Sequence, residues 1–316
     1  MPAAGYPLHR LRVAGIDRQN PMRAARALLL AARATGRARR LLRRLEADAV
    51  LGGGGYVAGP VGLAAGTLRL PLVLTEADSH LGVANRLLAP LARRVFLAFP
   101  LADRSGSKYV VTGRPVPAGT EGADREAARA RLGVAQDAAC VLVFGGSLGA
   151  RRLNEAALDA FGSAAPWAVV HAAGQRDYQE LRARLDELGS PDHYRLVPYI
   201  EPFADALAAA DLAVARAGGS VFELAAAGLP AILVPYPHAT ADHQTSNARF
   251  MEEAGAAVVI PDGELDGPCL AREVAALLGA PQRMAAMAKA ATAVARPDAA
   301  DRIADEVLGL VPNDGH

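Results

Sequence analysis

The chain has 316 residues, of which 52% are hydrophobic, a size and composition that suit two ordinary domains with real cores and exclude a disordered chain. The net charge is +1, so no overall positive field favours binding to nucleic acid. Only two isolated cysteines occur, Cys140 and Cys269, which indicates a reducing compartment and no cysteine-based metal site. Neither a signal peptide nor an apolar run of about 18 residues is visible, so we expect a cytoplasmic protein.

The first half of the chain is expected to alternate strands with helices. A short strand is expected at 10–15 and a helix at 21–45, where alanine, leucine and arginine follow a starting proline. Further strands are expected at 49–51, 72–75, 94–98 and 109–112, with helices at about 60–68 and 80–92. Residues 117–126 are rich in proline, glycine and acidic side chains and read as a linker, so the first domain is expected over 1–117.

The second half continues the alternation and is expected to form a domain over 118–296. After a helix at about 124–132, strands are expected at 139–144, 168–172, 194–197, 212–215, 231–234 and 257–259, with helices between them. Such alternation favours parallel sheets, so the predicted fold class is α/β with two Rossmann-like domains. A last helix, at about 299–309 within the segment 297–312, is expected to pack back on the first domain.

The most informative stretch reads RAGGSVFE at 216–223, and after the next strand HATADHQ follows at 238–244. Glycines precede a helix whose first turn carries a hydroxyl and a carboxylate, and the free N–H groups of such a helix start suit a phosphate. Glu223 and Gln244 are well suited to hydrogen-bond sugar hydroxyls. Strand ends in α/β sheets are where ligands bind. A glutamate there can also serve only the helix dipole, and that alternative stays open.

A second glycine-rich stretch, GGSLG at 145–149, follows a strand and opens a helix. Its backbone and the Ser147 hydroxyl suit a diphosphate. It lacks the G-x-G-x-x-G spacing and the lysine of a P-loop, so NAD and ATP are poor candidates. The sequence contains no Asp-x-Asp triplet, and His238 and His243 have no third ligand close by in the sequence. We therefore expect neither a metal nor a cofactor.

Two acids follow a strand in the first half, Glu76 and Asp78, with His80 close behind. In an extended segment both acids can point the same way, and the group could then do acid–base chemistry. The alternative is an N-cap by Asp78 or Ser79 for the helix that follows.

The predicted helix at 21–45 is strongly basic. Its arginines are Arg23, Arg26, Arg33, Arg37, Arg39, Arg40, Arg43 and Arg44, and they alternate with methionine and leucine side chains. A basic amphipathic stretch can rest on anionic lipid, or it can cover a core with a solvated face. We expect both, with one face packed on the sheet and an exposed end meeting a membrane.

Five segments in this order resemble the MurG family of bacterial N-acetylglucosaminyltransferases. Residues 51–60 look like the family's second glycine-rich loop, and GGSLGARRLN at 145–154 is close to its GGSQGARxLN motif. Residues 216–230 and 239–247 look like its donor motif and the glutamine-containing segment that follows, and AGAA at 254–257 also fits. The resemblance runs along essentially the whole chain, and the order and spacing of the pieces make it specific.

The resemblance implies a GT-B fold in which the carboxyl half holds UDP-N-acetylglucosamine and the amino half holds lipid I, at the inner face of the cell membrane. The implied reaction is inverting transfer to the muramoyl C4 hydroxyl, which gives lipid II for peptidoglycan. Implied donor-site residues are Gly146, Ser147 on the diphosphate, the Ile200 backbone on uracil, Gly219, Ser220, Val221, Glu223 on ribose and Gln244 on the sugar. Gly54, Gly55 and Tyr56 would form an acceptor loop, and Glu76 and Asp78 are the candidate catalytic acids.

The sequence departs from the family pattern in three places. The family's GGTGGH loop is not found, so the first domain is expected to lack its first strand and to expose an edge of its sheet. The family's His-Glu-Gln-Asn reads Thr75-Glu76-Ala77-Asp78 here, which removes a histidine and an asparagine. An expected arginine is Pro117, and Arg114 is a candidate substitute; His243 is a further candidate site residue.

Three alternatives to the lipid II-forming transferase stay open at this point. One is a related lipid glycosyltransferase, such as one that makes diacylglycerol glycolipids. Another is a UDP-N-acetylglucosamine 2-epimerase of similar architecture, which would use no lipid acceptor. The third is a nucleotide-sugar-binding or scaffold protein without catalysis, which the unmatched histidine loop would favour.

Overall fold

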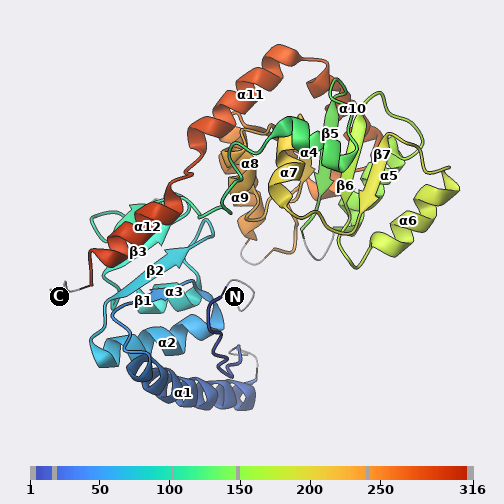
Figure 1. Ribbon diagram of the computed structural model, residues 1–316. Helices are drawn as coiled ribbons and strands as arrows, with labels where there is room; N and C mark the ends of the chain where they lie inside the picture. The colour runs from blue at the N-terminus through green and yellow to red at the C-terminus, as the bar shows by residue number, and fades with distance from the viewer. Residues whose placement is uncertain (1–4, 16–19, 102, 147–149, 240–241, 312–316) are drawn as a thin grey trace. The chain divides into compact units, whose positions relative to one another are not determined.

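The computed structural model describes residues 5–15, 20–101, 103–146, 150–239 and 242–311. The chain forms two compact units, one made of Met1–Arg114 and Asp298–His316 and the other of Pro115–Pro297. Both are α/β units with parallel sheets, so the predicted fold class is confirmed (Figure 1).

The first unit is built on a parallel sheet with the strand order β1-β2-β3-β4. The strands are β1 (Val50–Gly52), β2 (Leu72–Glu76), β3 (Arg94–Leu97) and β4 (Tyr109–Val111). The helices are α1 (Pro21–Arg44), α2 (Gly55–Leu68), α3 (Val83–Leu88) and α12 (Ala299–Leu308). Successive side chains of a strand point to opposite faces. Leu72 and Leu74 accordingly pack in one cluster with residues of α2 and α3, whereas Val73 packs with Ile303 of α12.

Three expectations for the first unit were wrong. Residues 10–15 form no strand, and the helix expected at about 80–92 is only the short α3. Helix α2 begins at Gly55, earlier than expected, and holds Pro60 in its interior. Local propensity disfavours a helix there, but Ala58, Ala64 and Ala65 are buried, and tertiary packing of one face supplies most helical stability in proteins.

The second unit contains a parallel sheet with the order β10-β9-β8-β5-β6-β7. Its strands are β5 (Cys140–Phe144), β6 (Ala168–Ala172), β7 (Tyr194–Val197), β8 (Leu212–Ala215), β9 (Ala231–Leu233) and β10 (Ala257–Val259). From β5 the chain proceeds outward to β7, then returns to β8 on the other side of β5 and proceeds to β10. The order therefore reverses between β5 and β8, and ligands of open α/β sheets bind outside the carboxyl ends of the strands at such a point.

Helices cover both faces of this second sheet (Figure 1). They are α4 (Arg125–Leu132), α5 (Arg151–Phe161), α6 (Tyr178–Glu187), α7 (Phe203–Ala209), α8 (Val221–Ala226), α9 (His243–Glu253), α10 (Gly267–Leu278) and α11 (Pro281–Val294), with a 3-10 turn, η3 (Asp262–Glu264). The main core joins α5 and α10 to the sheet through Val141, Leu153 and Leu270, each completely buried. Within the described part of the chain, no helix is long and apolar enough to cross a membrane.

Candidate functional site

The first element of the site is the glycine turn after β5, next to the point where the strand order reverses. A Cβ atom on Gly145 would lie 2.2 Å from the Cβ of Ala150, so only glycine allows this turn to come so close to the start of α5. Gly146 has a φ of +97°, a conformation that side chains rarely adopt. Ser147 lies outside the described residues. The turn thus brings exposed backbone next to the N-terminus of an eleven-residue helix.

A cavity of about 430 Å³ opens at this carboxyl edge of the second unit. Four predicted donor-site residues line it together: Gly146, Ile200, Ser220 and Glu223. Aromatic side chains form another part of its wall, where Phe144 and Phe203 meet edge to face with ring centroids 5.0 Å apart. Its size lies in the usual range for a small-molecule site, and it combines an apolar wall with a few polar groups.

The start of α8 supplies the polar side of this cavity. The Ser220 side chain makes no cap hydrogen bond with the helix. Val221 is only 1% exposed, so its side chain belongs to the core and only its backbone could serve a ligand. Gly219 is half-buried beside them, and Glu223 lies in the first helical turn. The turn therefore holds next to one another the residues that the family resemblance assigns to the donor site.

Gln244 is already oriented by the protein. Its Oε1 accepts a hydrogen bond of 3.0 Å from the backbone N–H of Tyr236. Its Nε2 would lie 4.0 Å from a Cβ placed on Gly218, so the amide NH₂ faces the RAGGS turn. Gln244 therefore presents a donor rather than an acceptor on that side.

Two residues that sequence reasoning did not single out hold this turn in place. Asn247 of α9 is buried and donates through Nδ2 to the carbonyl of Ala217, at 3.0 Å. Arg216 is 7% exposed, and its guanidinium lies 2.6 Å from an Asp262 carboxylate oxygen and also donates to the carbonyl of Val234. The sequence feature that could have pointed to Arg216 is its position, since it is a charged residue directly after an apolar strand.

The acids of the first unit are arranged differently. Glu76 is buried, and its carboxylate accepts hydrogen bonds from the backbone N–H of Asp78 at 3.3 Å and of Gly82 at 2.8 Å, and from Asn85 Nδ2 at 2.9 Å. These bonds tie the loop after β2 to the start of α3. Asp78 and His80 are half-buried. The N-cap of α3 is Gly82, so the alternative of an N-cap by Asp78 or Ser79 is wrong.

The remaining candidates lie at loop ends and helix starts. Gly54 precedes α2 as its N-cap and Gly55 begins it, while the Tyr56 side chain is 71% exposed. Arg114 is exposed at the end of the first unit's main segment, and His243 begins α9. Among the described residues, no group of three or more His, Cys, Asp or Glu side chains is arranged to hold a metal ion.

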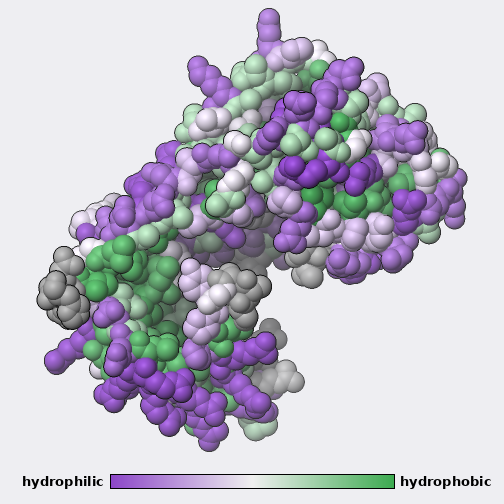
Figure 2. All heavy atoms as spheres, in the orientation of Figure 1, coloured by the Kyte–Doolittle hydropathy of each residue, from purple (hydrophilic) through white to green (hydrophobic). Residues whose placement is uncertain are grey.

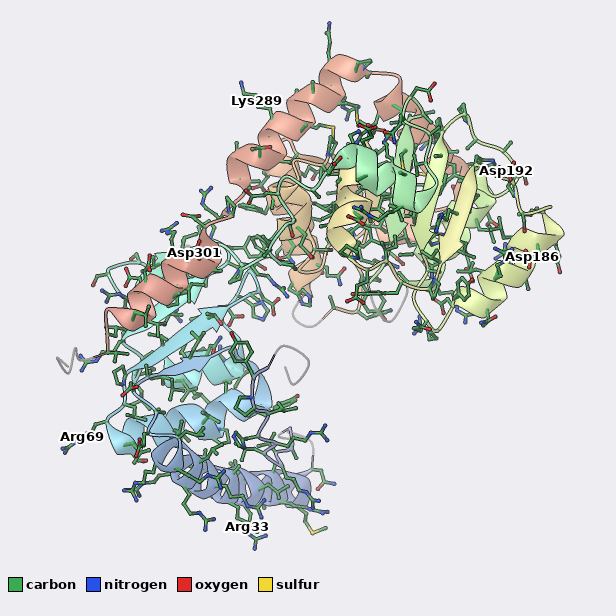
Figure 3. All side chains as sticks on the ribbon, in the orientation of Figure 1. Arg33, Arg69, Asp186, Asp192, Lys289 and Asp301 are labelled. Atoms are coloured by element: carbon green, nitrogen blue, oxygen red, sulfur yellow. The ribbon has the colours of Figure 1, made fainter. Side chains whose placement is uncertain are left out.

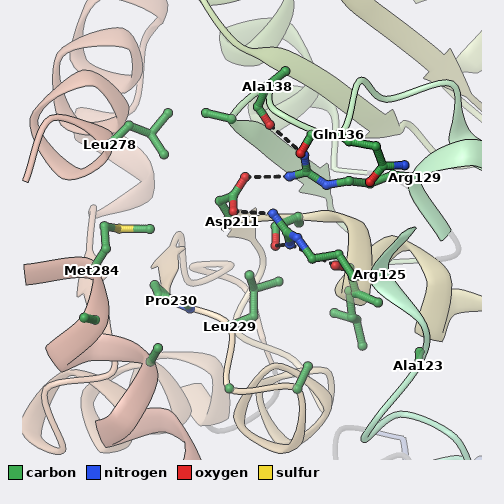
Figure 4. Close-up of a pocket in the computed structure, with 18 of the residues that line it drawn as sticks. Ala123, Arg125, Arg129, Gln136, Ala138, Asp211, Leu229, Pro230, Leu278 and Met284 are labelled. Atoms are coloured by element: carbon green, nitrogen blue, oxygen red, sulfur yellow. Dashed lines mark hydrogen bonds and ion pairs between the residues drawn. The ribbon is translucent and has the colours of Figure 1, made fainter. Parts of the chain in front are cut away.

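A larger cavity, of about 760 Å³, lies at the opposite, amino edge of the second sheet. Figure 4 shows its charged floor, where Arg125 and Arg129 flank Asp211 at 2.6 and 2.9 Å. The guanidinium of Arg129 also donates to four backbone carbonyls, and that of Arg125 donates to two. These arginine groups bind the protein's own backbone, so the site of interest is the smaller cavity.

Comparison with known sequences gives a consistent family. The glycosyltransferase family 28 C-terminal domain matches residues 140–303, and its N-terminal domain matches residues 1–97. A UDP-N-acetylglucosamine–N-acetylmuramyl-(pentapeptide) pyrophosphoryl-undecaprenol N-acetylglucosamine transferase from Methylococcus capsulatus is 44% identical, over 98% of this chain and 86% of that protein. Transferases of the same name from Salinibacter ruber and Halothermothrix orenii are 43% and 38% identical, over 98% and 94% of this chain and 84% of each relative.

Solved structures agree with the sequence comparison. MurG from Acinetobacter baumannii matches with a TM-score of 0.73 and 33% identity, over 90% of this chain and 79% of that one. A putative UDP-N-acetylglucosamine 2-epimerase from Listeria monocytogenes matches with a TM-score of 0.68 but only 18% identity, which shows a shared fold alone. The chain has the GT-B architecture and belongs to glycosyltransferase family 28, within the MurG family of N-acetylglucosamine transferases.

Proposed function

We propose that this protein transfers N-acetylglucosamine from UDP-N-acetylglucosamine to the muramoyl C4 hydroxyl of lipid I and so forms lipid II for peptidoglycan. The observation that carries the proposal is the cavity at the carboxyl edge, where Gly146, Ile200, Ser220 and Glu223 lie together. Relatives at 38–44% identity with that transferase name support it. They favour a transferase over a 2-epimerase, whose solved examples share only the fold at 18% identity or less.

Each part of the cavity suits one part of the donor. The glycine turn at Gly146, with Ser147, would hold the diphosphate, and the Ile200 backbone would meet uracil. Glu223 is a carboxylate in the polar part of the wall and would accept from ribose hydroxyls. Gly219 and Ser220 would offer backbone N–H groups, and the Gln244 amide would donate to the sugar. Val221 would support this turn, because its own N–H donates to the Gly218 carbonyl at 3.3 Å. Arg114 and His243 remain candidate contacts.

The chemistry needs a base for the acceptor hydroxyl and positive charge for the departing UDP. The first N–H groups of α5 have no partner within the helix and supply a partial positive charge at the diphosphate turn, so we propose that no metal ion is required. Glu76 and Asp78 stay the proposed catalytic acids. Because the Glu76 carboxylate already accepts three hydrogen bonds, Asp78 is the stronger candidate for the base.

The first unit carries a surface suited to a membrane. Among the side chains of α1 that the structure describes, the buried ones are the small Ala27, Ala34 and Ala38, whereas Met22, Leu28 and Leu29 are more than half exposed. Around them are the exposed arginines Arg26, Arg33, Arg37, Arg39, Arg40, Arg43 and Arg44. Figure 2 shows hydrophilic side chains along α1, and Figure 3 shows Arg33 pointing away from the unit. We propose peripheral binding of this helix to an anionic membrane at the cytoplasmic face.

Calorimetric titration with UDP-N-acetylglucosamine tests the donor assignment, with UDP-glucose and NADH as controls. Selective binding of the N-acetyl sugar is expected. No binding by folded protein would refute the proposed donor site. Release of UDP that depends on a lipid-linked muramoyl acceptor then tests the transfer itself, and release without that acceptor would speak against it. Addition of EDTA is expected to leave the transfer intact.

A further inference from the structure

A fully buried chain of polar side chains runs behind the diphosphate turn in the second unit. Asn154 of α5 and His171 of β6 have no exposed surface, and Tyr194 of β7 and Asp177 are 5% and 2% exposed. His171 Nδ1 lies 2.8 Å from the Tyr194 hydroxyl, and His171 Nε2 lies 3.0 Å from Asn154 Oδ1. Asn154 Nδ2 lies 2.9 Å from the Ala173 carbonyl and 3.1 Å from Asp177 Oδ2.

The direction of every hydrogen bond in this side-chain network follows from the two acceptors at its Asn154 end. A carbonyl and a carboxylate can only accept, so both protons of the Asn154 amide are donated to Ala173 and Asp177. Asn154 Oδ1 must then accept from His171 Nε2–H, which leaves Nδ1 to accept from the Tyr194 hydroxyl. Burial lowers the pKa of His171 to about 3, which agrees with a neutral ring. The network therefore has one set of hydrogen-bond directions in which every member has a partner.

The Asn154 end of this chain connects the two turns that border the nucleotide cavity. Asn154 lies one helical turn after Ala150, and its backbone N–H donates to the Ala150 carbonyl, so its side chain is rigidly connected to the turn at Gly145 and Gly146. Its amide holds Ala173, next to Gly174, and both Gly146 and Gly174 line the cavity.

Asp177 extends the connection to the surface. Its carboxylate lies 2.9 Å from Arg176 Nε, and 3.8 Å from a guanidinium nitrogen of Arg151, the first residue of α5. The same Arg151 guanidinium lies 3.3 Å from Glu180 of α6. These contacts close a ring of interactions around the first turn of α5.

We infer that Asn154 is a positioning residue for the donor diphosphate. Through its amide, and with the His171–Tyr194 pair behind it, Asn154 sets the distance between the turn after β5 and the turn after β6. A buried polar network that is fully satisfied makes one arrangement rigid, whereas a partly satisfied one does not. This inference rests on the proposed function, because it assumes that the cavity binds a nucleotide diphosphate.

The test compares UDP with uridine on the full chain. Asn154→Ala is expected to weaken UDP binding about ten-fold, because a small displacement of a binding turn is costly. Uridine, which has no diphosphate, should lose less than about two-fold, since its proposed contacts lie on the loop after β7. Calorimetry measures both affinities, and thermal unfolding measures stability.

Asp211→Asn is the matched control. It weakens a partly buried ion-pair cluster at the opposite edge of the same sheet and should lower stability without changing UDP affinity.

A folded Asn154→Ala protein with unchanged UDP affinity, or with equal losses for UDP and uridine, would overturn the inference. If that variant does not fold, Tyr194→Phe decides: it leaves His171 Nδ1 unpaired, and a selective loss of UDP affinity of about three-fold is expected. An unchanged UDP affinity in Tyr194→Phe would then overturn it. Failure of the unaltered protein to bind UDP would instead refute the proposed function.

Discussion

The two edges of the second sheet contrast sharply. At the amino edge, the cavity of about 760 Å³ is the larger, but its arginine donors are bound to Asp211 and to backbone carbonyls. At the carboxyl edge, the cavity of about 430 Å³ is bordered by glycine turns and by helix starts. The first four N–H groups of a helix have no partner within it. Volume alone therefore does not identify a site, whereas polar groups left available for a ligand do.

The contrast follows from strand direction. In a parallel sheet every strand leads at its carboxyl end into a loop and then the start of a helix, so free N–H groups collect at that edge. Helices end at the other edge, where carbonyls need donors. Arg125 supplies them to Ala208 and Ala210, at the end of α7. The amino edge is thus stabilised by its charges, and the carboxyl edge is where binding is expected.

The largest expected effect is on stability at the amino edge. Arg129→Met should lower the free energy of unfolding by about 3–5 kcal/mol, because it leaves four backbone carbonyls without this donor and removes the buried partner of Asp211. Affinity for UDP-N-acetylglucosamine should not change in the protein that remains folded. Urea unfolding and calorimetry measure the two quantities. A loss of donor affinity without a loss of stability would reverse the roles given to the two edges.

Glu223→Ala tests the carboxyl edge directly. Loss of a charged acceptor is expected to weaken UDP-N-acetylglucosamine binding by about 1.5–3 kcal/mol, with little change in the melting temperature, since the side chain lines a cavity. Glu223→Gln is the matched control that keeps the shape and one acceptor. Unchanged affinity in the alanine variant would leave Glu223 with only a helix-dipole role.

The pH dependence of the free energy of unfolding tests whether His171 is neutral in the folded protein. Because burial lowers the pKa of His171 to about 3 from its ordinary value of 6.5, the unfolded chain binds a proton between these values that the folded protein does not. The free energy of unfolding should therefore fall as the pH falls through this window, by at most about 1.4 kcal/mol per pH unit from this group. Urea unfolding between pH 7 and 5 should show a smaller slope in His171→Gln. An identical slope would mean that His171 is not the group that titrates.

The smallest expected effect concerns the sugar end of the donor. Gln244→Glu keeps the acceptor for the Tyr236 N–H but removes the NH₂ donor that faces Gly218. UDP-N-acetylglucosamine should bind about 1 kcal/mol more weakly, whereas UDP, which lacks the N-acetylglucosamine group, should bind as before. Equal losses for both ligands would place Gln244 at the nucleotide instead.

The sequence by itself determined most of the strands and the family. Strands β6, β7, β8 and β10 lie where the apolar runs predicted them, because a short apolar run bounded by turn residues has few alternatives in an α/β chain. The order of GGSLGARRLN and RAGGSVFE along the chain was sufficient to indicate the family, and the similarity to known transferases confirmed it. Local patterns were sufficient wherever a residue's role depends on its immediate neighbours.

Only the tertiary structure decided which residues meet. Asn154, His171 and Tyr194 are far apart in the chain and join only because β5, β6 and β7 are neighbours in the sheet. The start of α2 and the length of α3 were misjudged for the same reason, since buried alanines hold the glycine-rich helix and Glu76 holds the loop before α3. Long-range packing and hydrogen bonds outweigh local propensity there, and no single-sequence pattern carries that information.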